Sequence, residues 1–113
     1  MNLDTLLSYS SGDINFVKDT VKLFITESDK TFTDLRKSCK SNDWKTVNRL
    51  SHSLKSNCAT LGLEQLRVLA FDIEKGSKDY TGNGKDLQRM IDQLEKQTKG
   101  VYTLLLQELK RLS

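Results

Sequence analysis

The residue best suited to covalent chemistry in this sequence is its single histidine, His52, which lies in the stretch 49–62. If this part of the chain forms a helix with about 100° per residue, its apolar side chains gather on one face. The members of that face are Val47, Leu50, Leu54, Cys58 and Leu61. His52 falls about 160° from the middle of the face. We therefore expect a core to hold the helix while the imidazole points into solvent.

The positions around His52 on such a helix are polar, small or positively charged. They are Asn48, Lys55, Ser56 and Ala59. An exposed neutral imidazole can accept a phosphoryl group on one ring nitrogen, and this reaction requires mainly alignment and charge neutralisation. Lys55 could neutralise phosphate oxygens, and the small neighbours leave room for a partner that supplies the metal and the acceptor carboxylate. The alternative is an ordinary solvent-exposed histidine.

The remaining sequence excludes several other kinds of site. It contains no P-loop or GxGxxG motif for a nucleotide, and no ExxH pairs for a di-iron bundle. One histidine and two cysteines cannot form a zinc site alone, and Cys39 and Cys58 both fall on apolar helical positions. We expect both cysteines to be buried, reduced thiols, and we expect the protein itself to bind no metal or cofactor.

Length and charge indicate a single domain, residues 1–113, rather than a nucleic-acid-binding protein. A chain of 113 residues can bury a core without disulfide bonds. Its net charge is +3, but the charged residues are interspersed and form no basic run. Residues 1–10 contain neither a basic leader nor a long apolar run, so we expect no signal peptide, no membrane span and a cytoplasmic, reducing environment.

Apolar residues that recur every three or four positions predict one short and four long helices, with no strands. We expect these helices at residues 4–7, 14–39, 44–61, 63–76 and 87–112. Asp13 and Asp43 are suitable N-caps, Gly62 is a typical helix terminator, and residues 77–84 form a polar loop. The prediction is an all-α, antiparallel up-down four-helix bundle with the short N-terminal helix capping one end.

The order of residues around His52 resembles the signature of histidine-containing phosphotransfer (HPt) domains. The sequence HSLKS at 52–56, followed by LG at 61–62, is similar to the family pattern of His-x-hydrophobic-Lys-small and a closing hydrophobic-Gly pair. The similarity extends to DW at 43–44, to the preceding helix rich in Phe and Ile, and to IE at 73–74. The family fold, a four-helix bundle with a short helix across one end, agrees with the helices expected above.

The resemblance implies roles for individual residues. His52 would accept the phosphoryl group, and Lys55 would lie beside it. Ser56 occupies a small position that is most often glycine in the family, so its hydroxymethyl group either restricts docking slightly or bonds the phosphate. Glu74 matches a position where family members often place a glutamine that hydrogen-bonds the histidine ring. A carboxylate there could accept the Nδ1 proton and orient the ring but would repel phosphate; the alternative is a plain solvated residue.

A stripe beside the buried face of the helix expected at residues 63–76 gives a second indication. Its members are Arg67, Phe71, Glu74 and Lys78. Phe71 belongs either to the edge of the core or to an apolar patch near His52 that receives a partner domain. The candidate partner-binding residues are therefore Asn48, Ser56, Ala59, Phe71 and Glu74.

Together these features predict a phosphorelay intermediate that has no kinase activity of its own. It would accept a phosphoryl group on His52 from the receiver domain of a hybrid histidine kinase and pass it to a response regulator, with Mg²⁺ held only by the partner receiver. Two alternatives stay open: the phospho-accepting domain of a chemotaxis-type kinase, and a bundle that docks receivers without chemistry. We expect a monomer, with neither nucleic acid nor a membrane among its partners.

Overall fold

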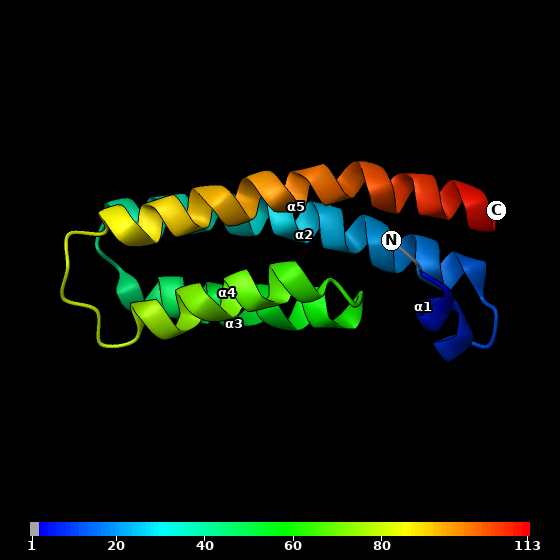
Figure 1. The fold of residues 1–113 in the computed structure, drawn as a ribbon, viewed down its shortest axis with the longest axis horizontal. Helices are drawn as coiled ribbons and strands as arrows, with labels where there is room; N and C mark the ends of the chain where they lie inside the picture. The colour runs from blue at the N-terminus through cyan, green and yellow to red at the C-terminus, as the bar shows by residue number, and fades with distance from the viewer. Residues whose placement is uncertain (1–2) are drawn as a thin grey trace.

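The computed structural model describes residues 3–113, which form five α-helices and no strand (Figure 1). In chain order the helices are α1 (Asp4–Tyr9), α2 (Ile14–Lys40), α3 (Trp44–Thr60), α4 (Glu64–Ser77) and α5 (Lys85–Leu112). The prediction of an all-α fold is confirmed for this part of the chain. His52 lies near the middle of α3, so the position of the site depends on how α3 is anchored.

The two aspartates expected to begin helices do so. The Asp13 carboxylate accepts hydrogen bonds from the amides of Asn15 and Phe16 in the first turn of α2, at 3.0 and 3.2 Å. Asp43 caps α3 through the amide and the hydroxyl of Thr46, at 3.2 and 2.6 Å. These side chains satisfy backbone amides that have no partner inside the helix. The starting residue of α3 is therefore specified locally.

The four long helices pack in a ring, in which α3 contacts α2 and α4, and α5 contacts the same two helices. The colours of Figure 1 show successive helices running in alternating directions. α2 and α5 are longer than the other two and extend beyond the turn between α3 and α4. α1 lies against α2 at this protruding end.

Side-chain contacts tie the N-terminal segment to the end of α5. Leu3 is 1% exposed, and its amide donates a hydrogen bond to Oε1 of Glu108 at 3.1 Å. Arg111 forms ion pairs with Glu108 and with Asp4 of α1. In the second pair, Nη2 of Arg111 lies 2.8 Å from Oδ1 of Asp4. These contacts hold α1 in place at one end of the molecule.

The core is built from the apolar stripes of the four long helices, together with Leu3. Its largest fully buried side chains include Phe32, Leu35, Leu54, Ile73, Ile91 and Leu94. Cys39 and Cys58 are both buried and free, as the sequence predicts. Burial raises the pKa of Cys39 and raises that of Cys58 to about 12. Because the thiolate is the reactive form, burial lowers the reactivity of both cysteines.

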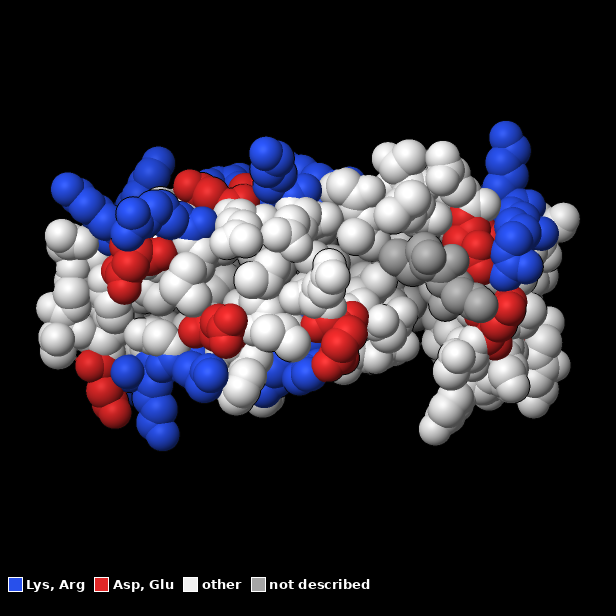
Figure 2. All heavy atoms as spheres, in the orientation of Figure 1, with Lys and Arg blue, Asp and Glu red and all other residues white. Residues whose placement is uncertain are grey.

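The surface carries charges of both signs. Figure 2 shows Lys and Arg side chains intermixed with Asp and Glu over the face in view. Within residues 3–113, no helix is long and apolar enough to cross a membrane. The same residues contain no group of three or more His, Cys, Asp or Glu side chains arranged to hold a metal ion.

Candidate functional site

The His52 side chain lies on the outer face of α3 and is 59% exposed, as the helical pattern predicts. The opposite face of the helix is packed in the core, where Val47, Leu54 and Cys58 are each no more than 1% exposed. The ring is therefore accessible to another protein, while the packed side of the same helix fixes its backbone.

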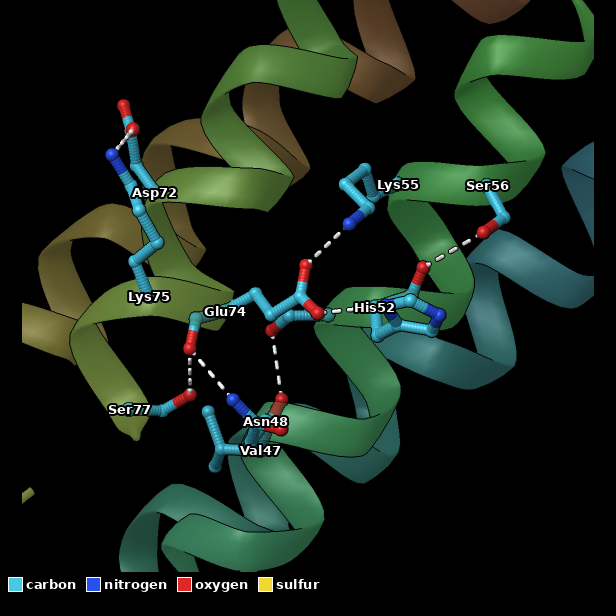
Figure 3. A network of polar contacts seen from close by, with 10 residues as sticks. Val47, Asn48, His52, Lys55, Ser56, Asp72, Glu74, Lys75 and Ser77 are labelled. Carbon is cyan, nitrogen blue, oxygen red and sulfur yellow. Dashed lines mark hydrogen bonds and ion pairs between the residues drawn. The ribbon is translucent and has the colours of Figure 1, made fainter. Parts of the chain in front are cut away.

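Glu74 reaches across from α4 and contacts the imidazole (Figure 3). Its Oε2 lies 2.6 Å from Nδ1 of His52. An ionised carboxylate has no proton to donate, so Nδ1 donates in this hydrogen bond and the carboxylate accepts. In the neutral ring the free lone pair then lies on Nε2, for which no hydrogen bond is found among the described residues.

The other oxygen of Glu74 is paired with Lys55, one helical turn beyond His52. The Lys55 Nζ lies 2.7 Å from Oε1, and the side chains of Lys55 and Glu74 are 22% and 18% exposed. The Lys55 ammonium holds the pKa of Glu74 below its usual value. Partial burial raises this pKa and so opposes the effect of Lys55, whereas the hydrogen bond with His52 lowers it further. Glu74 is therefore ionised at neutral pH, and it is not a plain solvated residue.

The backbone of Glu74 is held as well as its side chain. Nδ2 of Asn48 donates to the Glu74 carbonyl at 2.7 Å, and Oγ of Ser77 donates to the same oxygen at 3.0 Å. Asn48 lies one turn before His52 on α3, and its half-buried amide joins α3 to α4. Glu74 is thus held at both ends, which limits how far its carboxylate can move from the imidazole.

A shallow groove of about 340 Å³ lies one turn from the histidine. It is lined by Lys55, Ser56, Ala59, Arg67 and Phe71. Ser56 and Ala59 are exposed, and the Ser56 hydroxyl donates to the carbonyl of His52 at 3.2 Å. Phe71 is 38% exposed, so it lies at the surface rather than inside the core. The groove combines small side chains with an aromatic face, a composition that suits a protein-binding surface.

The prediction that Lys78 continues the stripe of residues along α4 is wrong. α4 ends at Ser77, so Lys78 lies beyond the helix and cannot continue the helical spacing. The cation that α4 places over the ring of Phe71 is Lys75, with its Nζ 4.7 Å from the ring centroid; Lys55 lies at 5.0 Å. The spacing of four residues between Phe71 and Lys75 could have identified this pair from the sequence. The contact with Lys55 depends on how α3 packs against α4.

A larger cleft, of about 690 Å³, lies between α1 and the turn that joins α3 to α4. It is lined mainly by apolar side chains, among them Leu6, Phe16 and Leu61. Ala59 is the one candidate site residue in its lining. His52 therefore lies on an open surface outside this cleft, where a large partner can approach it.

A model of the Hpt domain family matches residues 19–97. This range covers most of the chain and includes every candidate site residue from Asn48 to Glu74. Searches of curated proteins and of solved structures gave no match. Hpt domains carry phosphoryl groups on histidine in two-component signalling, and they interact with receiver domains and response regulators. The matched range includes the whole of α3, which carries His52, and the neighbouring helix α4. Because the family model matches well over half of the chain, the chain belongs to the Hpt domain family.

Proposed function

We propose that this protein is a cytoplasmic phosphorelay intermediate. His52 accepts a phosphoryl group from the receiver domain of a hybrid histidine kinase and passes it to the aspartate of a response regulator. The observation that carries this proposal is the 2.6 Å contact between Nδ1 of His52 and Glu74, which leaves Nε2 of an exposed ring with its lone pair free. Membership of the Hpt family supports histidine phosphotransfer as the activity.

In the transfer step, the Nε2 lone pair attacks the phosphorus atom of the receiver's aspartyl phosphate. The N–P bond forms while the bond between phosphorus and the aspartate oxygen breaks, and the receiver's carboxylate leaves with the electron pair. Alignment and charge neutralisation are the main requirements of this chemistry. The receiver supplies the Mg²⁺, so the Hpt chain needs no kinase activity or cofactor of its own. The reverse order of bond changes passes the group to the response regulator.

Lys55 neutralises charge on the phosphoryl group in this proposal. In the unphosphorylated protein its ammonium is paired with Glu74 at 2.7 Å. A phosphoryl group on Nε2 offers this ammonium a second anionic partner. Lysine has three donors at the end of a flexible stem, so Lys55 can contact both anions without losing the first.

The partner approaches over the groove beside His52. Ser56 and Ala59 leave space for the receiver's aspartate to reach Nε2, with Asn48 at the edge of the contact. Phe71 supplies apolar area between the positive charges of Lys55 and Lys75, which suits a partner that presents a phosphorylated carboxylate. The antiparallel up-down packing of α2–α5 provides the core within one chain, so a monomer is sufficient.

The test is incubation with a phosphorylated receiver domain and Mg²⁺, followed by intact-mass measurement. We expect one added phosphoryl group that survives alkali, is lost in acid and does not form in His52→Gln. Stable binding of the receiver without a gain in mass would refute the transfer function and leave a docking module. Phosphorylation from ATP by a kinase catalytic domain, with no transfer from any receiver, would instead favour the chemotaxis-type alternative.

A further inference from the structure

We propose that two copies of this chain pair weakly through an uncharged face of α5, with the two α5 helices crossing antiparallel at Gly100. The pairing goes beyond the proposed function and does not depend on it. Each copy keeps the core described above, so the pair forms between folded monomers and is in equilibrium with them.

The surface of α5 beside α4 carries an uncharged stripe that is about four helical turns long. Its exposed residues recur every three or four positions between Arg89 and Arg111 and are Gln93, Gln97, Gly100, Leu104 and Gln107. Most of the other exposed residues of this helix are Lys, Arg or Asp. The three glutamine side chains form no hydrogen bond among the described residues, so their amides are available to a partner.

Two shallow hollows between α4 and α5 continue this surface. Their volumes are about 340 and 390 Å³, and both are lined by Gln65 and Gln97. Apart from Glu64, the side chains that line them are uncharged. Val68, in the lining, and Leu104, on the stripe, are 42% and 47% exposed. The face therefore offers a partner mainly apolar area and amide groups.

Gly100 lies in the middle of the stripe, and nothing within the described chain requires a glycine there. Its φ is not positive, and a Cβ at this position would meet no atom within 4 Å. A glycine inside a helix is destabilising relative to alanine. A second helix that crosses at this point benefits from it, because the distance between two packed helices depends on the side chains at the contact. Gly100 therefore marks the crossing point.

The spacing about Gly100 makes the stripe complementary to itself. When two antiparallel helices cross on a two-fold axis, a residue before the crossing lies opposite the residue equally far beyond it. Gln93 and Gln107 lie seven positions on either side of Gly100, so a shallow crossing of about 20° brings their amides together twice. An amide both donates and accepts, so these pairs can hydrogen-bond. The occupant that fits the stripe is therefore a second copy.

The charges around the stripe are also compatible with a two-fold pair. The axis places α4 of one copy along the flank of the partner's α5 that lies away from that helix's own α4. This flank carries Lys96 and Lys110, whereas α4 carries Glu64 and Asp72. Figure 2 looks onto this side of the molecule and shows Lys and Arg side chains along the upper edge, beside α5, and acidic atoms over α4. Opposite charges therefore meet along both edges of the pair.

The ends of the stripe bring two arginines towards each other, because Arg89 and Arg111 lie eleven positions on either side of Gly100. Arg111 is already paired with Asp4 and Glu108, so its charge is compensated within its own copy. The pair therefore does not bury an uncompensated arginine opposite another.

The size of the face explains why the pair is weak. From Gln93 to Gln107 the stripe is about 21 Å long, and α4 and α5 together are about 20 Å wide. The pair buries roughly 400 Å² of each copy, whereas stable interfaces bury at least about 1,200 Å² in total. Because α3 lies across the ring of helices from α5, His52 stays accessible in both copies.

The first experiment measures the mass of the whole chain by sedimentation velocity, from about 10 μM to about 1 mM. It compares the wild type with Leu104→Glu and with a matched control, Leu106→Glu. The two leucines are 47% and 51% exposed but point about 200° apart around α5. We expect the mass of the wild type and of Leu106→Glu to rise above 12.9 kDa with concentration, while Leu104→Glu stays at the mass of one chain.

The second experiment tests the crossing point. Gly100→Cys places a thiol on the two-fold axis, so mild oxidation should link two copies by a disulfide bond. Leu106→Cys, compared at the same concentration, should link far less. Cys39 and Cys58 are buried, so the introduced cysteine is the accessible thiol in each variant.

A wild type that keeps the mass of one chain at about 1 mM would overturn the proposal. Equal effects of Leu104→Glu and Leu106→Glu, or equal cross-linking of the two cysteine variants, would also overturn it, because association would then not use this face. If the wild type stayed monomeric and Leu104→Glu lost binding to a receiver domain, the occupant would be the receiver and not a second copy. Failure of His52 to accept a phosphoryl group is measured separately and would refute the proposed function alone.

Discussion

Replacement of His52 by glutamine should abolish phosphorylation and leave the fold almost unchanged. The ring is 59% exposed, and its contact with Glu74 is the polar interaction that the substitution disturbs. Exposed pairs of this kind contribute about 0.2–1 kcal/mol. The glutamine amide can still donate to the carboxylate, so part of this contribution is kept. We expect a loss of at most about 1 kcal/mol, or a fall in Tm of roughly 5 °C.

Leu54→Ala is the matched comparison, because this residue lies two positions along α3 on the opposite face. Leu54 is 1% exposed and belongs to the core. Truncation of a buried leucine removes its transfer free energy and leaves a cavity, at a cost of about 2–5 kcal/mol. The two variants should therefore behave oppositely: His52→Gln loses function and keeps stability, whereas Leu54→Ala loses stability and, while folded, still accepts phosphate.

The assay is thermal unfolding followed by circular dichroism, run beside intact-mass detection of phosphorylation. A loss above about 2 kcal/mol in His52→Gln would exceed what an exposed side chain can contribute and would refute its placement on the outer face. Near-wild-type stability in Leu54→Ala would show that the buried face of α3 has been misassigned.

Three further predictions concern docking, acid stability and the start of α5. Ser56→Trp should block transfer from a receiver by filling the groove; unchanged stopped-flow rates would show that partners do not approach there. The Arg111 guanidinium lowers the pKa of Glu108 to about 2. Its charge therefore stabilises the fold above the usual glutamate pKa of about 4.3, and this stability is lost as the pH falls. Urea unfolding of the wild type and Glu108→Gln should converge in acid, and a constant difference would contradict the assignment. Gly84→Ala should lower Tm, because Gly84 has φ +86° and a Cβ would lie 2.6 Å from the Trp44 ring; an unchanged Tm would refute this.

Much of the fold could be predicted from local patterns. The caps at Asp13 and Asp43 and the glycine at position 62 mark helix ends that depend only on nearby backbone groups. The apolar spacing on α3 correctly placed His52 in solvent, because one buried stripe determines which side of a helix is exposed. The same method was wrong at Lys78, since it extended the helical spacing past the last residue of α4.

The role of Glu74 could not be read from the sequence in the same way. Its position matched a family glutamine, but a carboxylate there could equally have been a solvated side chain. The distance of 2.6 Å to His52 and the pairing with Lys55 are relations between two helices. They depend on the rotation and axial offset of α4 against α3, which the spacing of residues within either helix does not specify.

The sequence by itself thus determined the helices, the outward direction of the histidine and the family, because helical periodicity, capping and a short motif are local properties of the chain. Only the tertiary structure decided which nitrogen of His52 carries the proton, where Lys55 is held and which cation covers Phe71. Those features lie at the interface between α3 and α4. The relative position of these two helices is determined by buried side chains that interdigitate across the core.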